Sequence, residues 1–426
     1  MNFLSMVHAW CNVHGYLWAG RALQRHIAER RLRRTVREAY RRVPWYRDSF
    51  DRHGIDVSAF RAQDLQRLPL LTKQQVAENF PDRIVAAGTD LRKAMTSSTS
   101  GSSGQALHLA YSPRTYAYYL ATALRVYTMV GYRPWHRMTY IKFMDVERPR
   151  YSLGPFFRVD HLNSALPVEG HVEALRARPP DLLIGYASSV MEIARYLQRH
   201  PEPRIAPKFI SLNSEYSTAL DRQFIAEVFG CPVYDEYSSE ETWMIASQCR
   251  AGHYHVFTDN VVLELLDDTG QPVPEGEIGH VVLTTLNNPL MPLIRYRLGD
   301  MARARPGRCV CGSALPMLES FEGRADDALR MPGGRRIPSA VPICAVIRYI
   351  HAYRDAIASF KFLQTELHRV ELLLVPGAGF RDEIADGLVA ELRPQLDAGV
   401  ELVPRLVDAI DPGRIKRRVV ECRVRD

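Results

Sequence analysis

Residues 208–234, KFISLNSEYSTALDRQFIAEVFGCPVY, decide the predicted fold. A short apolar run, Lys208–Leu212, is followed by a helical stretch around Ile225 and then by a second apolar run, Cys231–Tyr234. The same rhythm occurs upstream, in the runs Met138–Phe143 and Asp181–Ile184. Strands that alternate with helices pack as a mostly parallel sheet covered by helices. The sequence therefore predicts an α/β fold.

The chain of 426 residues is long for one domain and predicts a large body with a smaller appendage. In the body, Val261–Leu266 and Gly279–Leu286 predict a hairpin around the turn Asp267–Gly270, so the sheets are expected to be mixed. We expect the body to span 1–324, with a helical lead-in over about 1–80. Residues 325–426 are expected to form the appendage, a small α+β domain with its own core. Its predicted elements are helix Val341–Tyr353, strands Ile357–Leu363 and Arg369–Val375, helix Asp382–Leu392 and a short last strand.

The composition is that of an ordinary globular protein, with 46% hydrophobic and 24% charged residues. The net charge of +7 comes mostly from arginine, and no nucleic-acid partner is inferred from it. The N-terminus lacks a basic region and a cleavage site, and no apolar run is long enough to span a bilayer, so a soluble cytoplasmic protein is expected. Seven scattered cysteines, an odd number, argue against a disulfide framework.

A run of hydroxyl residues and glycines precedes the first expected strand of the body. Small hydroxyl side chains and unhindered backbone NH groups suit the oxygens of a polyphosphate, although such runs also occur as flexible linkers. The residues concerned are Thr99, Ser100, Gly101, Ser102, Ser103 and Gly104.

Polar residues follow the expected strands at Tyr186, Asn213–Thr218 and Asp235–Glu241. In open α/β sheets, ligands collect at the carboxyl ends of the strands. These residues are therefore the first candidates for chemistry.

Four motifs, in order, carry a resemblance to a known family. They are Thr99–Gln105, Asn213–Tyr216, Tyr234–Glu241, and Ile294–Asp300 followed by Gly323–Asp327. Their order and spacing resemble the adenylate-forming superfamily, and most closely its phenylacetate-CoA ligase branch. The Tyr-Arg-x-Gly-Asp element that ends at Asp300 is the most specific piece. The resemblance implies an ATP-dependent ligase that converts a carboxylic acid to an acyl adenylate, releases pyrophosphate and passes the acyl group to a thiol.

The resemblance also implies roles for single residues. The Ser/Gly loop would hold the leaving phosphates, although Gln105 stands where the family has a lysine. Glu241 would bind Mg²⁺, with Glu240 as the alternative if the register slips by one. Asp300 would accept hydrogen bonds from both ribose hydroxyls, and Arg324 would add positive charge beside the ribose and phosphate.

The base would lie against a separate group of residues. Tyr237 matches the aromatic residue that packs against adenine, and the segment Asn213, Ser214 and Glu215 lines the base. Asp235 belongs to the same nucleotide-binding set. Taken one by one, residues of these types are more often structural.

Cysteine spacing indicates a metal site. Cys309 and Cys311 form a tight pair, and Cys249 with either His255 or His253 lies on what is expected to be a neighbouring loop. Four such ligands would complete a closed, structural Zn²⁺ site. Unrelated reduced thiols are the alternative.

The C-terminal domain departs from the family pattern. Asp326 matches the hinge on which this domain pivots, and a plain linker is the alternative reading. The family lysine near the C-terminus is replaced by Arg414, with Lys416 two residues on, and either could contact the α-phosphate.

The substrates are less closely defined by the sequence. Segments expected near the acyl group mix aromatic and small residues, which suits an aryl or other small planar acid, although Phe156 and Phe157 could be ordinary core. Coenzyme A is the expected acceptor, an amine is the first alternative, and a non-catalytic nucleotide-binding homologue is the second. The oligomeric state is left open, with a homodimer allowed.

Overall fold

The computed structural model describes residues 3–98, 107–143, 151–353, 356–410 and 419–424. The predicted phosphate loop Thr99–Gly104 and the C-terminal cations Arg414 and Lys416 lie outside these residues.

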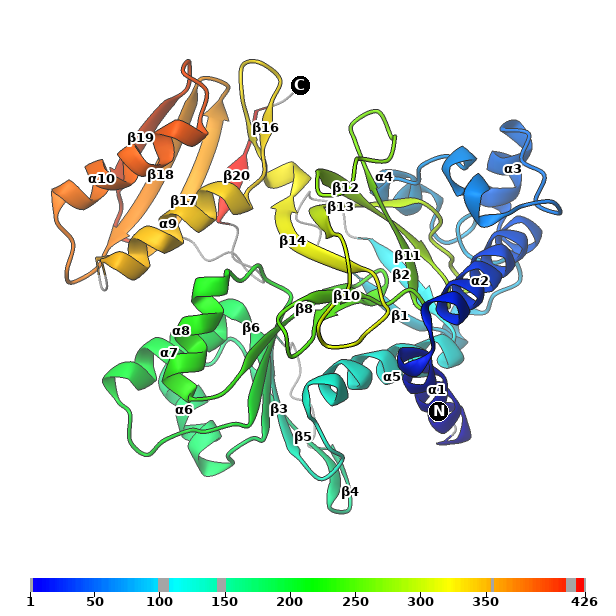
Figure 1. Cartoon of the computed structure of the whole chain (residues 1–426), viewed down its shortest axis with the longest axis horizontal. Coiled ribbons are helices and arrows are strands. Elements are labelled where there is room, and N and C mark those ends of the chain that lie inside the picture. The colour runs from blue at the N-terminus through cyan, green and yellow to red at the C-terminus, as the bar shows by residue number, and fades with distance from the viewer. Residues whose placement is uncertain (1–2, 99–106, 144–150, 354–355, 411–418, 425–426) are drawn as a thin grey trace.

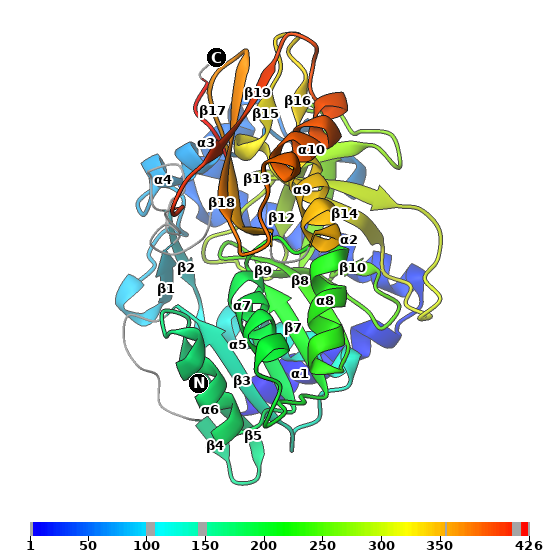
Figure 2. The ribbon, with the colours of Figure 1, turned by 90° about the vertical axis from the view of Figure 1, so that its left-hand side faces the viewer.

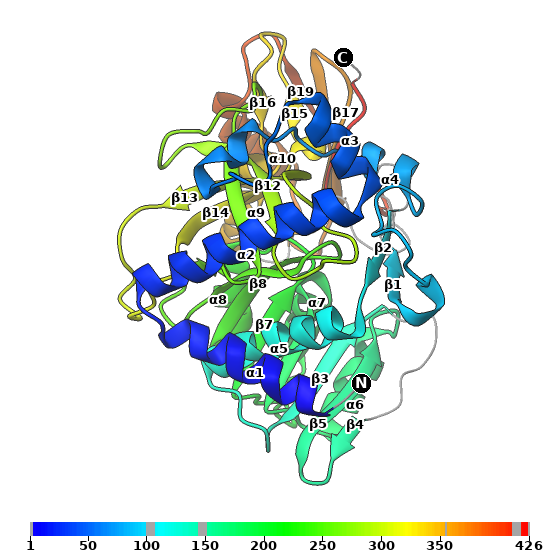
Figure 3. The same cartoon turned by 90° about the vertical axis from the view of Figure 1, so that its right-hand side faces the viewer.

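Helices form the first part of the chain. They are α1 (Phe3–Trp18), α2 (Arg21–Arg42), α3 (Pro44–Arg52) and α4 (Lys73–Asn79), with short 3₁₀ turns at Ala62–Arg67 and Leu91–Lys93. Figure 3 shows α1 and α2 lying across the outer side of the body. These helices lie where the sequence predicts a helical lead-in, and the chain turns at Val43 because Pro44 ends α2 and starts α3.

A twelve-stranded sheet forms the centre of the described body. Its order is β11-β12-β13-β14-β10-β9-β8-β7-β6-β3-β5-β4. The strands are β3 (Arg137–Lys142), β4 (Tyr151–Leu153), β5 (Phe156–Asn163), β6 (Leu182–Tyr186), β7 (Phe209–Asn213), β8 (Val233–Ser239), β9 (Trp243–Gln248), β10 (Tyr254–Val256), β11 (Val261–Leu266), β12 (Ile278–Thr285), β13 (Tyr296–Arg305) and β14 (Met317–Arg324). Strands β8, β7, β6, β3 and β5 are parallel, whereas β9 to β14 pair antiparallel. The mixed α/β prediction is confirmed.

Helices cover both faces of the parallel strands. On one face lie α6 (Val168–Ala177), α7 (Ala187–Arg199) and α8 (Ala219–Phe229), which bury Leu183, Ile210 and Leu212 (Figures 1 and 2). On the other face lies α5 (Pro113–Val130), whose Val126 and Tyr127 pack with residues of β3, β6 and β7. Side chains of alternate residues in a strand therefore enter two different cores.

A two-stranded ribbon pairs β1 (Met95–Ser98) with β2 (His108–Tyr111). The first expected strand of the body thus corresponds to β2 and begins at His108. None of the helices in the described ranges has both the length and the apolar composition needed to cross a bilayer.

A second hydrophobic core lies after residue 328. The elements of this part are β15 (Leu329–Arg330), β16 (Arg336–Ile337), α9 (Ala340–Ala352), β17 (Ile357–Glu366), β18 (Arg369–Pro376), α10 (Asp382–Leu392), a 3₁₀ turn at Arg393–Gln395, β19 (Glu401–Leu406) and β20 (Val420–Cys422). Four of the strands form a sheet in the order β19-β18-β17-β20, packed on α9 and α10 (Figure 1). Its predicted helices and strands are present.

One detail of the predicted body is wrong. Strand β8 does not end at Tyr234 but continues to Ser239, because its polar residues find partners inside the protein. The predicted hairpin of β11 and β12 with its turn Asp267–Gly270 is present, and the chain after the turn pairs back onto Leu266 through Pro272 before β12 begins.

Candidate active site

Of the site residues that belong to the parallel strands, two lie at the carboxyl ends of their strands and two lie within a strand. Asn213 is the last residue of β7, and Tyr186 is the last residue of β6, its direct neighbour in the sheet. Asp235 and Tyr237 lie within β8, not after it as expected. The sheet thus brings these residues to one edge.

Asp300, Tyr237 and Arg324 form a contact cluster from three strands. The Tyr237 hydroxyl donates a hydrogen bond to Asp300 Oδ2 at 2.8 Å, although 63 residues separate the two in the chain. Arg324 is the neighbour of Asp300 across the β13–β14 pair, with its Nε 3.6 Å from Asp300 Oδ1. The Tyr237 ring packs on Phe321 with centroids 3.9 Å apart. An aromatic face and an ionised carboxylate therefore lie side by side.

Glu241 joins this cluster through Tyr296. The Tyr296 hydroxyl donates to Glu241 Oε1 at 3.0 Å, and Glu241 is buried. The Tyr111 hydroxyl of β2 donates to the backbone carbonyl of Glu240, whose side chain is exposed. The structure therefore anchors the turn after β8 to the ribbon that flanks the Ser/Gly loop.

The segment Asn213, Ser214 and Glu215 turns away from β7. Ser214 has φ +64, a left-handed conformation that is uncommon for a residue with a side chain. Glu215 Oε2 accepts a hydrogen bond from the backbone NH of Ser188 in the first turn of α7, at 2.8 Å. A carboxylate at a helix N-terminus is stabilised by the unpaired NH groups there.

Two consecutive carboxyl groups of β8 are buried. Burial raises the pKa of Asp235 to about 6, although Arg222 and hydrogen bonds from Tyr254 and Ser217 oppose the shift. Burial raises the pKa of Glu236 to about 8, although a hydrogen bond from Ser211 opposes it. Both carboxyl oxygens of Asp235 thus accept a hydrogen bond, Oδ1 from Ser217 and Oδ2 from Tyr254.

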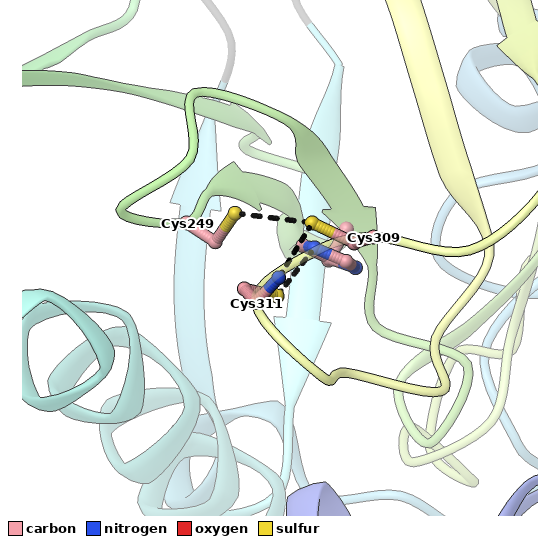
Figure 4. Close-up of side chains that lie close together, drawn as sticks. Cys249, Cys309 and Cys311 are labelled. Atoms are coloured by element: carbon pink, nitrogen blue, oxygen red, sulfur yellow. Dashed lines mark hydrogen bonds between the residues drawn. The ribbon is translucent and has the colours of Figure 1, made fainter.

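The four predicted zinc ligands lie together. Cys249 follows β9, His255 lies in β10, and Cys309 and Cys311 lie between β13 and β14, with their ligand atoms all within 4.8 Å of one another (Figure 4). The Sγ atoms of Cys249 and Cys309 are 3.7 Å apart, and Cys311 Sγ is 3.3 Å from His255 Nε2. A tetrahedral zinc with Zn–S bonds of about 2.3 Å places its sulfurs about 3.8 Å apart, so the spacing fits. Of the two candidate histidines, His255 completes the set, while His253 Nδ1 contacts Cys309 Sγ from outside it at 3.2 Å.

Of the remaining predicted residues, the structure describes some and not others. Asp326 lies in a 3₁₀ turn, Ala325–Asp327, between β14 and β15. Of the segments expected near the acyl group, Met144–Glu147 falls outside the described ranges, and Phe156 is 43% exposed, which excludes it from the core.

Comparisons with known proteins agree with this arrangement. No family model matches the chain. The chain is 28% identical over 333 residues to the phenylacetate-coenzyme A ligase of Thermus thermophilus, with 74% of each chain covered. It is 24% identical over 407 residues to the phenylacetate-coenzyme A ligase of Aromatoleum evansii, covering 91% of this chain and 90% of the relative. A crystal structure of 2-hydroxyisobutyryl-CoA ligase in the postadenylation state, in complex with R3-HIB-AMP, has the same fold, with a TM-score of 0.77, 18% identity and coverage of 94% of this chain and 89% of that one.

The similarity to phenylacetate-coenzyme A ligases and the shared fold support the resemblance of the four motifs to the phenylacetate-CoA ligase-like branch of the adenylate-forming superfamily.

The sequence alone does not point to two residues of this site. Tyr296 stands inside the Tyr-Arg-x-Gly-Asp motif without a predicted role, and Phe321 lies outside the four motifs. The position of Tyr296 within the motif is the one signal that the sequence offers for it.

Proposed function

We propose that the protein is an ATP-dependent acid–thiol ligase. It would activate a carboxylic acid to an acyl adenylate, release pyrophosphate and transfer the acyl group to the thiol of coenzyme A. The observation that carries the proposal is the convergence of Tyr237 of β8, Asp300 of β13 and Arg324 of β14 with Glu241 of the turn after β8. The phenylacetate-CoA ligases of similar sequence support the acid, ATP and the thiol acceptor.

Asp300 and Tyr237 are the groups that would hold the nucleoside. An ionised carboxylate has two oxygens and can accept from both hydroxyls of a ribose. The Tyr237 hydroxyl holds Asp300 in place, while the Tyr237 ring offers an apolar surface to the base. Arg324 would place positive charge beside the sugar and phosphate.

Glu241 is the proposed ligand for Mg²⁺. Its Oε1 accepts from Tyr296, and the second carboxylate oxygen suits a hard cation that prefers oxygen ligands. Bound there, the ion would neutralise charge on the phosphates of ATP as the carboxylate of the substrate approaches. The Ser/Gly loop Thr99–Gly104 would hold the departing phosphates.

The chain after residue 324 is proposed to move as a domain, with Asp326 as its hinge. Its core is separate, and Gly323 before the hinge has φ +86, where a Cβ would meet Ser339 Oγ at 1.9 Å. Only glycine fits this turn. Arg414 or Lys416 would bring positive charge to the α-phosphate in one orientation of the domain.

The cluster of Cys249, His255, Cys309 and Cys311 is proposed to bind one structural Zn²⁺. With four protein ligands the site has no open position for a substrate. It would tie the loop between β13 and β14 to β9 and β10, and so support the strand pair that carries Asp300 and Arg324. We also propose that two copies of the chain associate as a homodimer.

Acid-dependent exchange of pyrophosphate into ATP tests the first half-reaction, whatever the acceptor. Asp300→Ala removes charge-assisted hydrogen bonds, each with a net value of about 1.5–3 kcal/mol, so we expect a loss of at least about 100-fold in exchange rate. The matched control is Asp386→Ala, the same change on the exposed surface of α10, which is expected to keep the wild-type rate. An Asp300→Ala protein with the wild-type rate would show that the nucleotide lies elsewhere.

The acceptor is tested by AMP release with the acid and ATP present. Stimulation by coenzyme A supports the thiol ligase, whereas stimulation by amines alone would make the enzyme an amide synthetase. ATP binding with exchange at background over a broad acid panel would favour a non-catalytic homologue.

A further inference from the structure

Helix α2 holds the net positive charge of the protein. It contains nine arginines and two glutamates, a net charge of +7, and this equals the net charge of the whole chain. The rest of the sequence is therefore neutral on balance. Charge that is concentrated on one element creates a local field that attracts anions, which the same charge spread over the surface would not do.

Exposed arginines lie on one side of this helix. Arg30, Arg34 and Arg41 are exposed and follow one another by four and seven residues, so they project from the same side of α2. The exposed Leu23 stands seven residues before Arg30 and shares that side. The buried residues of the helix are Gln24, Leu32, Thr35, Val36 and Ala39. The helix is thus fixed to the body by one side and presents arginine on the other.

The arginines on this side are poorly paired. Within the described ranges, Arg30 and Arg34 form no ion pair, and Arg41 has a loose one to Glu38 at 3.8 Å. The pKa of Arg34 is lowered by partial burial and then by the positive charges of three neighbours. These neighbours are Arg31, Arg114 and Arg30. Because like charges repel, an anion bound at this side would be stabilised.

Two exposed apolar side chains lie where α1 meets α2. Trp18, the last residue of α1, is 89% exposed, and Leu23, in the first turn of α2, is 54% exposed. Helix α1 itself contains no Asp, Glu, Lys or Arg. Figure 3 shows both helices on the face turned to the viewer, with this corner between them. Tryptophan favours the boundary between water and hydrocarbon, so a corner of this kind beside an arginine-rich helix is typical of a surface that binds membranes.

We propose that this face of α1 and α2 binds the surface of a bilayer that contains anionic phospholipids. The lipid phosphates would pair with Arg30, Arg34 and Arg41, while Trp18 and Leu23 enter the headgroup region. Helix α2 would not insert more deeply, because its apolar side is already buried in the body. Such a contact requires no membrane-spanning helix, and it does not depend on the proposed ligase function.

The apolar corner favours a bilayer over other anionic partners. Nucleic acid would pair with the arginines and could stack on Trp18, but it would leave Leu23 in water. A second copy of the chain placed with its α2 on this face would meet it with the same positive charges. Figure 1 shows α9 and α10 at the other end of the molecule from α1 and α2, so a bilayer here would leave the C-terminal part of the chain free.

Co-sedimentation of the full chain with lipid vesicles tests the proposal. Vesicles of phosphatidylcholine alone are compared with vesicles that also contain phosphatidylglycerol. We expect the affinity for the anionic vesicles to be at least about 100-fold higher, and to fall steeply when the salt concentration is raised to about 0.5 M. Equal binding to both kinds of vesicle, or binding to neither, overturns the proposal.

Two triple variants locate the contact. An arginine near an anionic surface contributes about fivefold to binding, so Arg30→Gln, Arg34→Gln and Arg41→Gln together are expected to lower the affinity about 100-fold. The matched control replaces three exposed arginines outside α2 and removes the same net charge, and it is expected to lose less than about threefold. Its changes are Arg199→Gln, Arg336→Gln and Arg381→Gln. Equal losses in the two variants would show that net charge, and not this face, binds the lipid, and would overturn the proposal.

Tryptophan fluorescence tests the apolar corner separately. Brominated phosphatidylcholine in the anionic vesicles is expected to quench the fluorescence of the bound protein, and Trp18→Phe should remove most of this quenching. Trp135→Phe, at a tryptophan that is 54% exposed outside α1 and α2, is the control and should keep it. Quenching that Trp18→Phe leaves unchanged would place the membrane contact elsewhere and overturn the proposal. Binding to a DNA duplex without binding to anionic vesicles would overturn it too and assign the face to nucleic acid.

Discussion

The buried carboxyl group of Glu236 makes the stability of the body depend on pH. Burial raises the pKa of Glu236 from 4.5 to about 8, so the folded protein holds a proton there that the unfolded chain releases. The sign follows from proton binding: between these two values the native state binds more protons, and the free energy of unfolding falls as pH rises. The contribution of the Glu236 proton to the free energy of unfolding is complete below pH 4.5 and is lost as pH rises through about 8.

The size of the effect follows from the shift. One pKa unit corresponds to about 1.4 kcal/mol, so the full shift from 4.5 to about 8 changes the free energy of unfolding by at most about 5 kcal/mol. Burial raises the pKa of Asp235 from 3.8 to about 6 and acts in the same direction, but mainly at lower pH. Between pH 6.5 and 8 the Glu236 contribution dominates and falls by about 1.5 kcal/mol.

Urea unfolding at pH 6.5, 7.2 and 8 measures this loss. Tryptophan fluorescence reports the body alone, because all five tryptophans precede residue 244. Glu236→Gln cannot titrate and is expected to lose about 1.5 kcal/mol less than the wild type over this window. Glu366→Gln, at an exposed position, is the control and is expected to follow the wild type. Parallel pH curves for the wild type and Glu236→Gln would refute the buried, protonated state of Glu236.

Two further predictions concern the metal cluster and the core. Elemental mass spectrometry of the purified protein is expected to find one Zn²⁺ per chain. The Cys309→Ser variant should lose this zinc, and the control variant Cys11→Ser, at an exposed cysteine, should keep it. Wild-type protein of normal stability that contains no zinc would show that the four residues do not bind the metal. Arg125→Met is expected to lower the free energy of unfolding, measured in urea, by about 3–5 kcal/mol, because it leaves the buried charge of Asp259 without its ion-pair partner. The control variant Arg30→Met, at an exposed position, should lower it by less than about 0.5 kcal/mol. An Arg125→Met loss below about 1 kcal/mol would mean that Asp259 finds another partner.

The helix α5 shows how local sequence sets the bounds of an element. It runs from Pro113 to Val130 because Ser112 caps its start, Pro113 fits the first turn, and Gly131 with φ +123 ends it. All of these signals act within a few residues. The four motifs are local in the same sense, and so the resemblance to the family could be seen without the structure.

Strand β8 shows where local reasoning ends. The polar residues after Tyr234 predicted a loop, yet β8 continues through them to Ser239. Asp235 is satisfied by Tyr254 and Ser217, and Tyr237 by Asp300, none of which is close in sequence. A polar residue can remain in a buried strand when distant side chains complete its hydrogen bonds.

Of the four candidate zinc ligands, the sequence predicted three and left the fourth open. The cysteine spacing indicated the three cysteines, but His253 and His255 were equivalent candidates by spacing alone. The antiparallel pairing of β10 with β9 and β14 placed His255 with the cysteines.

The amino-acid sequence by itself determined the strand–helix rhythm, the caps of α5, the motifs and hence the resemblance, because these depend on neighbours in the chain. Only the tertiary structure decided that Tyr237 meets Asp300 and that Glu236 is buried beside Ser211. The physical reason is that hydrogen-bond partners and burial are set by the order and register of strands, which bring together residues far apart in the chain.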